Sequence, residues 1–184
     1  MPVETVEAAV VGGVDAVHLR DPGASARELW MRANALRPRL AGRAQLVVND
    51  RLDVAIAVGA DGAQLGARSL PVEEARRVAP DLPLGVSVHS VGDAIAAAAA
   101  GAAWLVVGTI YESGSHPGQP GAGPALLAEA SRLSGVPVIA IGGISPANAS
   151  ACVAAGAYGV AVITAITRAA DPRAAAQALR RAIA

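Results

Sequence analysis

The chain has 184 residues, a formal net charge of +0 and one cysteine. This length favours a single domain over residues 1–184. Without a basic run or an aromatic series, the sequence excludes nucleic acid as a partner, and its apolar segments are too short to span a bilayer, so we expect no membrane either. The lone Cys152 cannot form an internal disulfide, which favours a cytoplasmic location, and its alanine-rich surroundings favour a packed thiol over a nucleophile.

Helices and strands are predicted to alternate along the whole chain. The eight predicted helices are 3–12, 25–38, 51–58, 71–79, 90–100, 124–134, 146–155 and 171–183. Strands are predicted in the apolar segments between them, including 44–49, 83–88, 136–141 and a last strand over 159–166. Ser25 and Asp171 are predicted N-caps, the second followed by a proline suited to the first helical position.

One junction recurs four times: an alanine-rich or valine-rich helix end, a glycine, and a short step into an apolar strand. The glycines at these junctions are Gly13, Gly59, Gly101 and Gly156. A glycine just past a helix adopts the left-handed conformation that ends it. The recurrence divides the chain into four modules, each with two strands and two helices, except that the first lacks its leading strand.

Four such modules make a (β/α)₈ TIM barrel, so the sequence predicts an α/β barrel with the first strand missing from this chain. An open barrel would leave two unpaired strand edges, which is costly. We therefore expect either that a strand belongs before this sequence, or that another segment or chain fills the slot. The alternative, an open doubly wound sheet, fits a fourfold repeat poorly.

Polar side chains are expected at the mouth of this barrel, where the strands end. His18 and Arg20 share one side of their strand, because side chains alternate with a period of two. An arginine aimed into a barrel needs an anion or a carboxylate, and a structural ion pair with Asp50 is the alternative to ligand binding.

Two further strands bring polar residues to the same mouth. Asn49 and Asp50 follow one strand and could orient a polar ring or hold a cation. Ser87 and His89 share one side of another strand. His89 could equally cap the next helix.

A phosphate site is predicted after the last two strands. Gly142 and Gly143 would let backbone N–H groups approach an anion before a helix begins, and Thr164 lies at the matching level of the last strand. The alternative is that these glycines only permit tight packing at the rim.

The segment 108–124 is rich in glycine and proline and stands between a strand and a helix. Its place at the mouth predicts a loop that closes over a ligand rather than a slack linker. Ser113, Ser115 and His116 would then be held towards that ligand.

The chain resembles the thiamine phosphate synthase/TenI superfamily along nearly its whole length. The segments that match, in order, are 18-HLRD-21, 49-NDR-51, 61-DGAQLG-66, 85-GVSVH-89, 108-GTIYESGSH-116, 138-VIAIGGI-144 and 159-GVAVITAI-166. The resemblance implies one barrel domain that normally begins with a strand before the first helix. It also implies a small phosphorylated thiazole or pyrimidine as ligand, and it leaves open whether the protein is a homo-oligomer.

Two activities share this barrel in the family. A synthase joins a pyrimidine methyl pyrophosphate to a thiazole phosphate and releases pyrophosphate, with Mg²⁺ held by two carboxylates. A TenI-type protein binds the thiazole phosphate and aromatises it by moving a proton, for which a phosphate site and an acid/base group suffice.

The synthase pattern is kept in part. The residues that match it are Arg20, Asn49, Asp50, Ser87, Ser113, Ser115, Gly143, Ile163 and Thr164. Its two lysines fall on Pro22 and His116, and its second metal carboxylate falls on Ser69. Losing such charges at a pyrophosphate site should cost about 1.5–3 kcal/mol for each hydrogen bond.

These losses favour a TenI-like isomerase that binds a thiazole phosphate and requires no cofactor. The histidine that serves this group as catalyst would fall on Thr109, which becomes a substrate-binding candidate instead. We expect His116, His18 or His89 to take the catalytic role, since a histidine near neutral pKa can shuttle a proton.

Two alternatives stay open from the sequence. One is an active synthase, in which His116 and His18 replace the lysines and Asp50 holds Mg²⁺. The other is a non-catalytic, regulatory barrel that only binds its ligand.

Overall fold

A single sheet of seven parallel strands, in the order β1 to β7, forms the centre of the protein. The structure is a computed structural model that describes residues 2–113, 118 and 120–184. The strands are β1 (Ala16–Leu19), β2 (Gln45–Asn49), β3 (Gly62–Leu65), β4 (Leu84–Val88), β5 (Trp104–Val107), β6 (Val138–Ile141) and β7 (Gly159–Ala161). Each strand pairs with the next in sequence, as a barrel requires.

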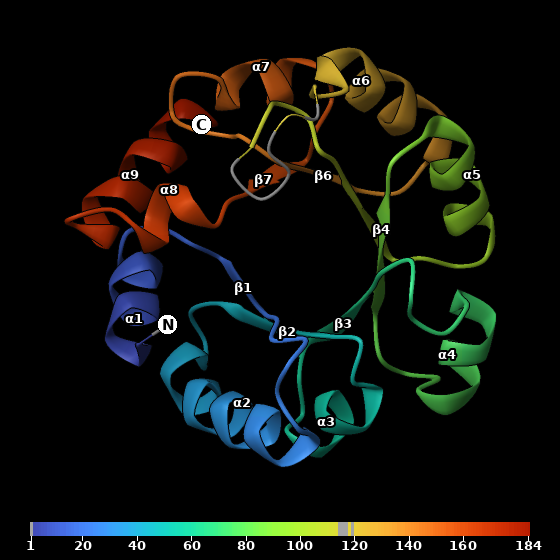
Figure 1. Cartoon of the computed structure of the whole chain (residues 1–184), viewed down its shortest axis with the longest axis vertical. Coiled ribbons are helices and arrows are strands. Elements are labelled where there is room, and N and C mark those ends of the chain that lie inside the picture. Colours follow the sequence, from blue (N-terminus) through green and yellow to red (C-terminus); the bar gives the residue numbers. More distant parts are fainter. Residues whose placement is uncertain (1, 114–117, 119) are drawn as a thin grey trace.

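Helices form a ring outside the strands (Figure 1). They are α1 (Val3–Val11), α2 (Ala26–Leu40), α3 (Leu52–Ala57), α4 (Val72–Val78), α5 (Val91–Ala99), α6 (Gly123–Ser134), α7 (Ala149–Ala154), α8 (Thr164–Thr167) and α9 (Pro172–Ala182). All eight predicted helices are present. Ser25 caps α2 through a reciprocal contact with Glu28, and Asp171 caps α9 by accepting from Ala174 N at 3.0 Å.

The fourfold junction has the predicted backbone conformation. Gly13, Gly59, Gly101 and Gly156 have φ of 107°, 61°, 96° and 95°. A side chain is disfavoured at such angles, so glycine is what allows each helix to end and the chain to return to the sheet. The sequence repeat is therefore a structural repeat.

The expected barrel with one strand missing is confirmed. In the described residues β1 and β7 are the two ends of the sheet and do not pair with each other. The ring of helices nevertheless closes, because α1 packs against α9 (Figure 1). Gly12 permits this approach: a Cβ there would lie 2.5 Å from the carbonyl oxygen of Arg173.

The prediction of a last strand over 159–166 is wrong at its carboxyl end. The strand β7 stops at Ala161, and Ile163 already has helical backbone angles (φ −115°, ψ −76°). The short helix α8 follows and buries Ile166. An apolar run does not distinguish a strand from a buried helical turn by its periodicity, which explains the error.

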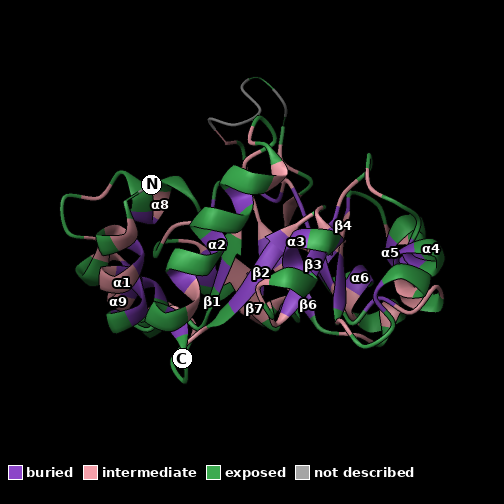
Figure 2. Ribbon diagram, turned by 90° about the horizontal axis from the view of Figure 1, so that it is seen from below, coloured by how far each residue is buried: buried purple, intermediate pink, exposed green. Residues whose placement is uncertain are grey.

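Small aliphatic side chains fill the space between the sheet and the helices. They form two clusters, one mainly from residues 6–84 and one mainly from residues 88–179. Figure 2 shows the buried residues on the strands and on the inward faces of the helices. None of the helices in the part of the chain that the structure describes has the length and apolar character needed to cross a bilayer.

The indole of Trp104 lies inside the barrel, against Gln64. Two glycines on neighbouring strands, Gly62 and Gly85, make room for it: a Cβ on Gly62 would lie 2.6 Å from the ring, and one on Gly85 would collide with it. The indole supports the polar residues above it at the carboxyl ends of the strands.

Candidate functional site

The mouth of the barrel contains a hollow of about 400 Å³ beside the carboxyl ends of β1 and β2. Its lining includes Asp21, Asn49, Asp50, Arg51 and Arg68. Parallel strands end on one side of their sheet, so residues distant in sequence meet here. The structure thereby brings Asn49 and Asp50, which the sequence predicted as site residues, together with Arg68.

A chain of hydrogen bonds joins His18, Asn49 and Asp50. Asn49 Nδ2 donates to Asp50 Oδ2 at 3.3 Å, and Asn49 Oδ1 lies 3.2 Å from His18 Nε2. A carboxylate can only accept, so the amide NH₂ faces Asp50 and the amide oxygen faces the imidazole. His18 Nε2 therefore carries the hydrogen, and Nδ1 keeps the free lone pair of the neutral ring.

The surroundings of His18 favour this neutral form. Although the residue keeps contact with solvent, burial of its ring by the barrel wall lowers the pKa of His18 below 6.5. The hydrogen bond with Asn49 raises the pKa, and the charge of Arg20 lowers it. Burial is the largest of these effects. His18 is thus suited to accept hydrogen bonds or a proton at neutral pH, and less suited to replace a lysine.

Asp50 is held in an unusual backbone conformation. Its φ of 62° makes it the one residue other than glycine with positive φ in the described chain. Ser69 Oγ donates to Asp50 Oδ1 and itself accepts from Gly66 N at 2.6 Å. Such conformations occur at functional sites, where the surroundings enforce them. The structure therefore supports Asp50 as a site residue and shows that Ser69 contacts it.

The described residues include no group of three or more acidic, histidine or cysteine side chains that could hold a metal. Asp50 provides one carboxylate with the Ser69 hydroxyl beside it. Mg²⁺ prefers oxygen ligands and is often held by one or two carboxylates together with phosphate oxygens of the substrate. These residues fit that minimal arrangement, with a substrate completing the set.

Arginine is the only fixed cation at this mouth, because the chain contains no lysine. In the described part of the chain, Arg20 and Arg68 form no ion pair, so the alternative of an Arg20–Asp50 pair is not realised. Arg51 is paired with Asp53. Comparison of matched positions missed Arg68, which lies beside the expected metal carboxylate rather than at a former lysine position.

Ser87 and His89 both form hydrogen bonds across strands. Ser87 Oγ accepts from Gln64 Nε2 at 3.0 Å. His89 Nδ1 contacts the carbonyl oxygen of Gly108, so Nδ1 carries a hydrogen and donates it. The alternative of His89 as a helix cap is not realised, since Ser90 caps α5. Gln64 was missed because it stands within an apolar run.

The opposite side of the mouth is built from backbone. Gly142 and Gly143 follow β6, and Ile163 and Thr164 lie where β7 gives way to α8. Within the described residues, the N–H groups of Gly143 and Ile163 donate no backbone hydrogen bond. These N–H groups are therefore available to donate hydrogen bonds at the predicted phosphate site.

The two glycines are also closely packed, so the alternative of tight packing holds as well. A Cβ on Gly142 would lie 2.5 Å from Thr109 Cγ2, and a Cβ on Gly143 would lie 2.8 Å from the carbonyl oxygen of Tyr111. The loop after β5 thus rests on the loop after β6, with Tyr111 N donating to Gly142 O at 3.0 Å. This contact also places Thr109 against the rim.

Ser113 lies in the same loop and is half-buried. Ser115 and His116, which the sequence placed over the ligand, lie outside the described residues. Their predicted roles stay predictions.

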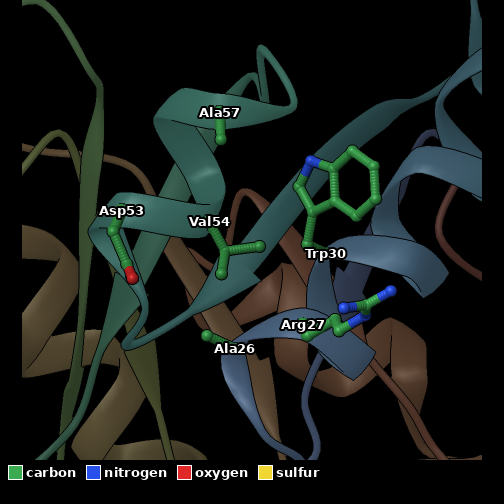
Figure 3. Close-up of a pocket in the computed structure, with 6 residues that line it drawn as sticks. All are labelled: Ala26, Arg27, Trp30, Asp53, Val54 and Ala57. Carbon is green, nitrogen blue, oxygen red and sulfur yellow. The ribbon is translucent and has the colours of Figure 1, made fainter.

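A second hollow of about 250 Å³ lies between α2 and α3, on the outside of the barrel. Figure 3 shows Trp30 from α2 and Val54 from α3 on its two sides. It is lined by helical residues and by none of the residues at the strand ends, so we assign no chemistry to it.

Several known proteins similar to this chain are named thiamine-phosphate synthases. The family model described as thiamine monophosphate synthase matches residues 2–166. Thiamine-phosphate synthase from Methanoculleus marisnigri is 46% identical over 96% of this chain and 85% of that protein, and the one from Roseiflexus sp. is 44% identical over 98% and 78%. The solved thiamine phosphate pyrophosphorylase from Pyrococcus furiosus has a TM-score of 0.93 and 36% identity, covering 100% of this chain and 89% of that one.

These relatives correct the expectation of a TenI-like isomerase. That expectation counted missing charges only at matching positions, yet proteins 44–46% identical over almost the whole chain are named synthases. The physical reason is that arginines at other positions can also bring positive charge to the mouth, so a lysine lost at one matched position does not remove that charge. By its sequence, its barrel and its strand-end residues, the chain belongs to the thiamine monophosphate synthase family.

Proposed function

We propose that this protein is a thiamine phosphate synthase. It would join a pyrimidine methyl pyrophosphate to a thiazole phosphate, breaking the bond between the pyrimidine methylene carbon and a pyrophosphate oxygen. The observation that carries the proposal is the 44–46% identity to synthases over 96–98% of the chain. The polar residues at the mouth fit the two halves of this reaction.

The side formed by β1 to β4 suits the pyrophosphate. Arg20 and Arg68 have no ion-pair partner among the described residues. Asp50 is a carboxylate with Ser69 and Asn49 as neighbours. A guanidinium group binds phosphate oxygens in a bidentate manner and stabilises negative charge as it develops. His18, neutral at neutral pH, lies beside Asn49 as an acceptor for the pyrimidine.

Asp50 is the residue that would hold Mg²⁺, with pyrophosphate oxygens as further ligands. When bound, Mg²⁺ neutralises charge on the departing pyrophosphate. The contribution of the chain is to hold the Asp50 carboxylate in place through Ser69 and Asn49.

The side formed by β6 and β7 suits the thiazole phosphate. Gly143 and Ile163 provide backbone N–H groups without backbone partners in the described chain, and Thr164 follows Ile163 as the first residue of α8. Such donors bind an anion without an additional charged side chain. The two substrates would therefore meet across the mouth, each held by its own phosphate groups.

The direct test is to incubate the purified protein with both phosphorylated precursors and Mg²⁺, and to measure thiamine phosphate and released pyrophosphate together. We expect equal amounts of the two products, with formation abolished by a chelator. Omitting either precursor is the matched control.

Binding of both precursors without any thiamine phosphate would contradict the proposal and favour the non-catalytic barrel. Pyrophosphate released without thiamine phosphate would also contradict it, since that result means hydrolysis.

A further inference from the structure

Three side chains form a hydrogen-bonded chain across the interior of the barrel. Trp104 Nε1 of β5 donates to Gln64 Oε1 of β3 at 2.9 Å, and Gln64 Nε2 donates to Ser87 Oγ of β4 at 3.0 Å. Gln64 is 2% exposed and is the one buried polar residue of the described chain. Burying an amide is costly unless both its ends are satisfied, which these contacts achieve.

The indole of Trp104 sets the direction of donation in this series of hydrogen bonds. An indole N–H can only donate, so the amide oxygen of Gln64 must face Trp104. The amide NH₂ then faces Ser87, whose oxygen must accept. A hydroxyl has a single hydrogen, and that of Ser87 donates to no other group in the described structure. It is left for a ligand in the mouth.

The surrounding backbone is shaped to permit this arrangement. A Cβ on Gly85 would collide with both the Trp104 ring and Gln64 Oε1. The carbonyl oxygen of Gln64 also accepts from Asp50 N at 3.0 Å. Gln64 therefore lies under the Asp50 side of the mouth, where the pyrophosphate is expected.

We propose that Gln64 and Trp104 are positioning residues, which hold the Ser87 hydroxyl so that its hydrogen is directed to an anionic oxygen of the pyrophosphate group. Ser87 is already a candidate from its place on the strand; the inference adds the two residues beneath it. It rests on the proposed synthase function.

A double-mutant cycle tests the coupling. Ser87→Ala removes the donor, and Gln64→Met removes the group that orients it while keeping a similar shape. We expect each variant to raise the KM of the pyrophosphate substrate and the Kd of inorganic pyrophosphate with Mg²⁺ by about tenfold. The double variant should be no worse than Ser87→Ala, because Gln64 acts only through Ser87. If the effects of Ser87→Ala and Gln64→Met on the KM and the Kd multiply in the double variant, the inference is wrong.

The hydrogen bonds can also be observed without activity. In the NMR spectrum the Trp104 indole N–H should exchange slowly in the wild type and shift in Gln64→Met. Trp30, which is 42% exposed on α2, provides the internal control and should not change. Wild type and Ser87→Ala suffice should Gln64→Met fail to fold, since loss of Ser87 should speed exchange of the Gln64 side-chain NH₂.

The results separate this inference from the function on which it rests. If the wild type binds pyrophosphate but forms no thiamine phosphate, the proposed synthase function is wrong. The double-mutant cycle measured by the Kd of pyrophosphate then still tests the role of Gln64. A wild type that does not bind pyrophosphate, or a Trp104 signal unchanged in Gln64→Met, contradicts the inference itself.

Discussion

The two sides of the barrel mouth are built in different ways. On the β1 to β4 side, side chains do the work, and each depends on a neighbour: His18 on Asn49, Asn49 on Asp50, and Asp50 on Ser69. On the β6 and β7 side, the candidate donors are the backbone N–H groups of Gly143 and Ile163, which have no backbone partner among the described residues. Substitutions on the first side can preserve its overall charge. The second side depends on backbone angles that few residue types can adopt.

The largest expected effect comes from replacing Asp50, which lies at the centre of the β1 to β4 side; we call this side the side-chain half and the β6 and β7 side the backbone half. Asp50→Asn keeps the shape and tolerates the left-handed backbone, since asparagine adopts it readily. Loss of the carboxylate should lower kcat/KM for thiamine phosphate formation by about a hundredfold, equivalent to about 3 kcal/mol. The dependence on Mg²⁺ concentration should weaken in parallel.

Asp53→Asn is the control for that variant. Asp53 is 63% exposed in its ion pair with Arg51, so kcat/KM should change less than twofold. Equal losses in the two variants would show that Asp50 has no special role.

The backbone half is tested by Gly143→Ala. Its φ of 62° disfavours a side chain, and the new Cβ would lie 2.8 Å from the Tyr111 carbonyl oxygen. We expect the free energy of unfolding to fall by about 3 kcal/mol, with a raised KM for the thiazole phosphate. Thermal unfolding and steady-state kinetics measure the two effects.

Gly42→Ala is the matched control, with a similar φ of 69° but no atom within 4 Å of the added Cβ. It should cost about 1 kcal/mol and leave the KM unchanged. A KM effect in Gly42→Ala, or none in Gly143→Ala, would remove the distinction between the two halves.

The charge of the side-chain half is tested by Arg68→Ala. Removing this guanidinium should raise the Kd of pyrophosphate with Mg²⁺ about tenfold and leave the Kd of the thiazole phosphate unchanged. Isothermal titration measures both, and Arg132→Ala on α6 serves as the control. Weakening of both ligands alike would mean that Arg68 acts through the general field of the protein.

The smallest expected effect concerns the protonation of His18. NMR titration should find its pKa below 6.5. Arg20→Gln should raise the pKa by removing a nearby positive charge, and Asn49→Ala should lower it by removing the favourable hydrogen bond. Shifts of the opposite sign would contradict the arrangement described above.

Because the pKa of His18 is lowered in the folded protein, the free energy of unfolding depends on pH. Below pH 6.5 the unfolded chain binds the proton more readily than the folded protein. The contribution of His18 is therefore complete above that pH and is lost as the pH falls through the folded pKa.

Much of the fold could be predicted, because helix ends and strand faces leave local signals. The junction glycines and the alternation around His18 and Arg20 are of this kind. The helix α8 could not be predicted, since an apolar run suits a strand and a buried turn equally. Trp104 and Gln64 meet only through the curvature of the sheet, which links residues 40 positions apart.

The error over function had a different physical cause. The expectation of an isomerase takes two lysines missing at matched positions as charge missing from the mouth. In a chain without lysine, positive charge at the mouth depends on where arginines gather in space, and Arg68 stands at no position where the synthase pattern has a lysine. Asn49 and Asp50 could be predicted because they are adjacent in sequence and end a strand.

The packing of α1 against α9 has a consequence for how the chain acquires its structure. The helix α1 contributes Ala9 to one hydrophobic cluster and Val6 and Val10 to the other, so it joins both. The helices α1 and α9 lie at opposite ends of the described chain, so α1 is synthesised long before its partner. We expect the amide hydrogens of α1 to gain protection last during refolding, because loops of this length close late.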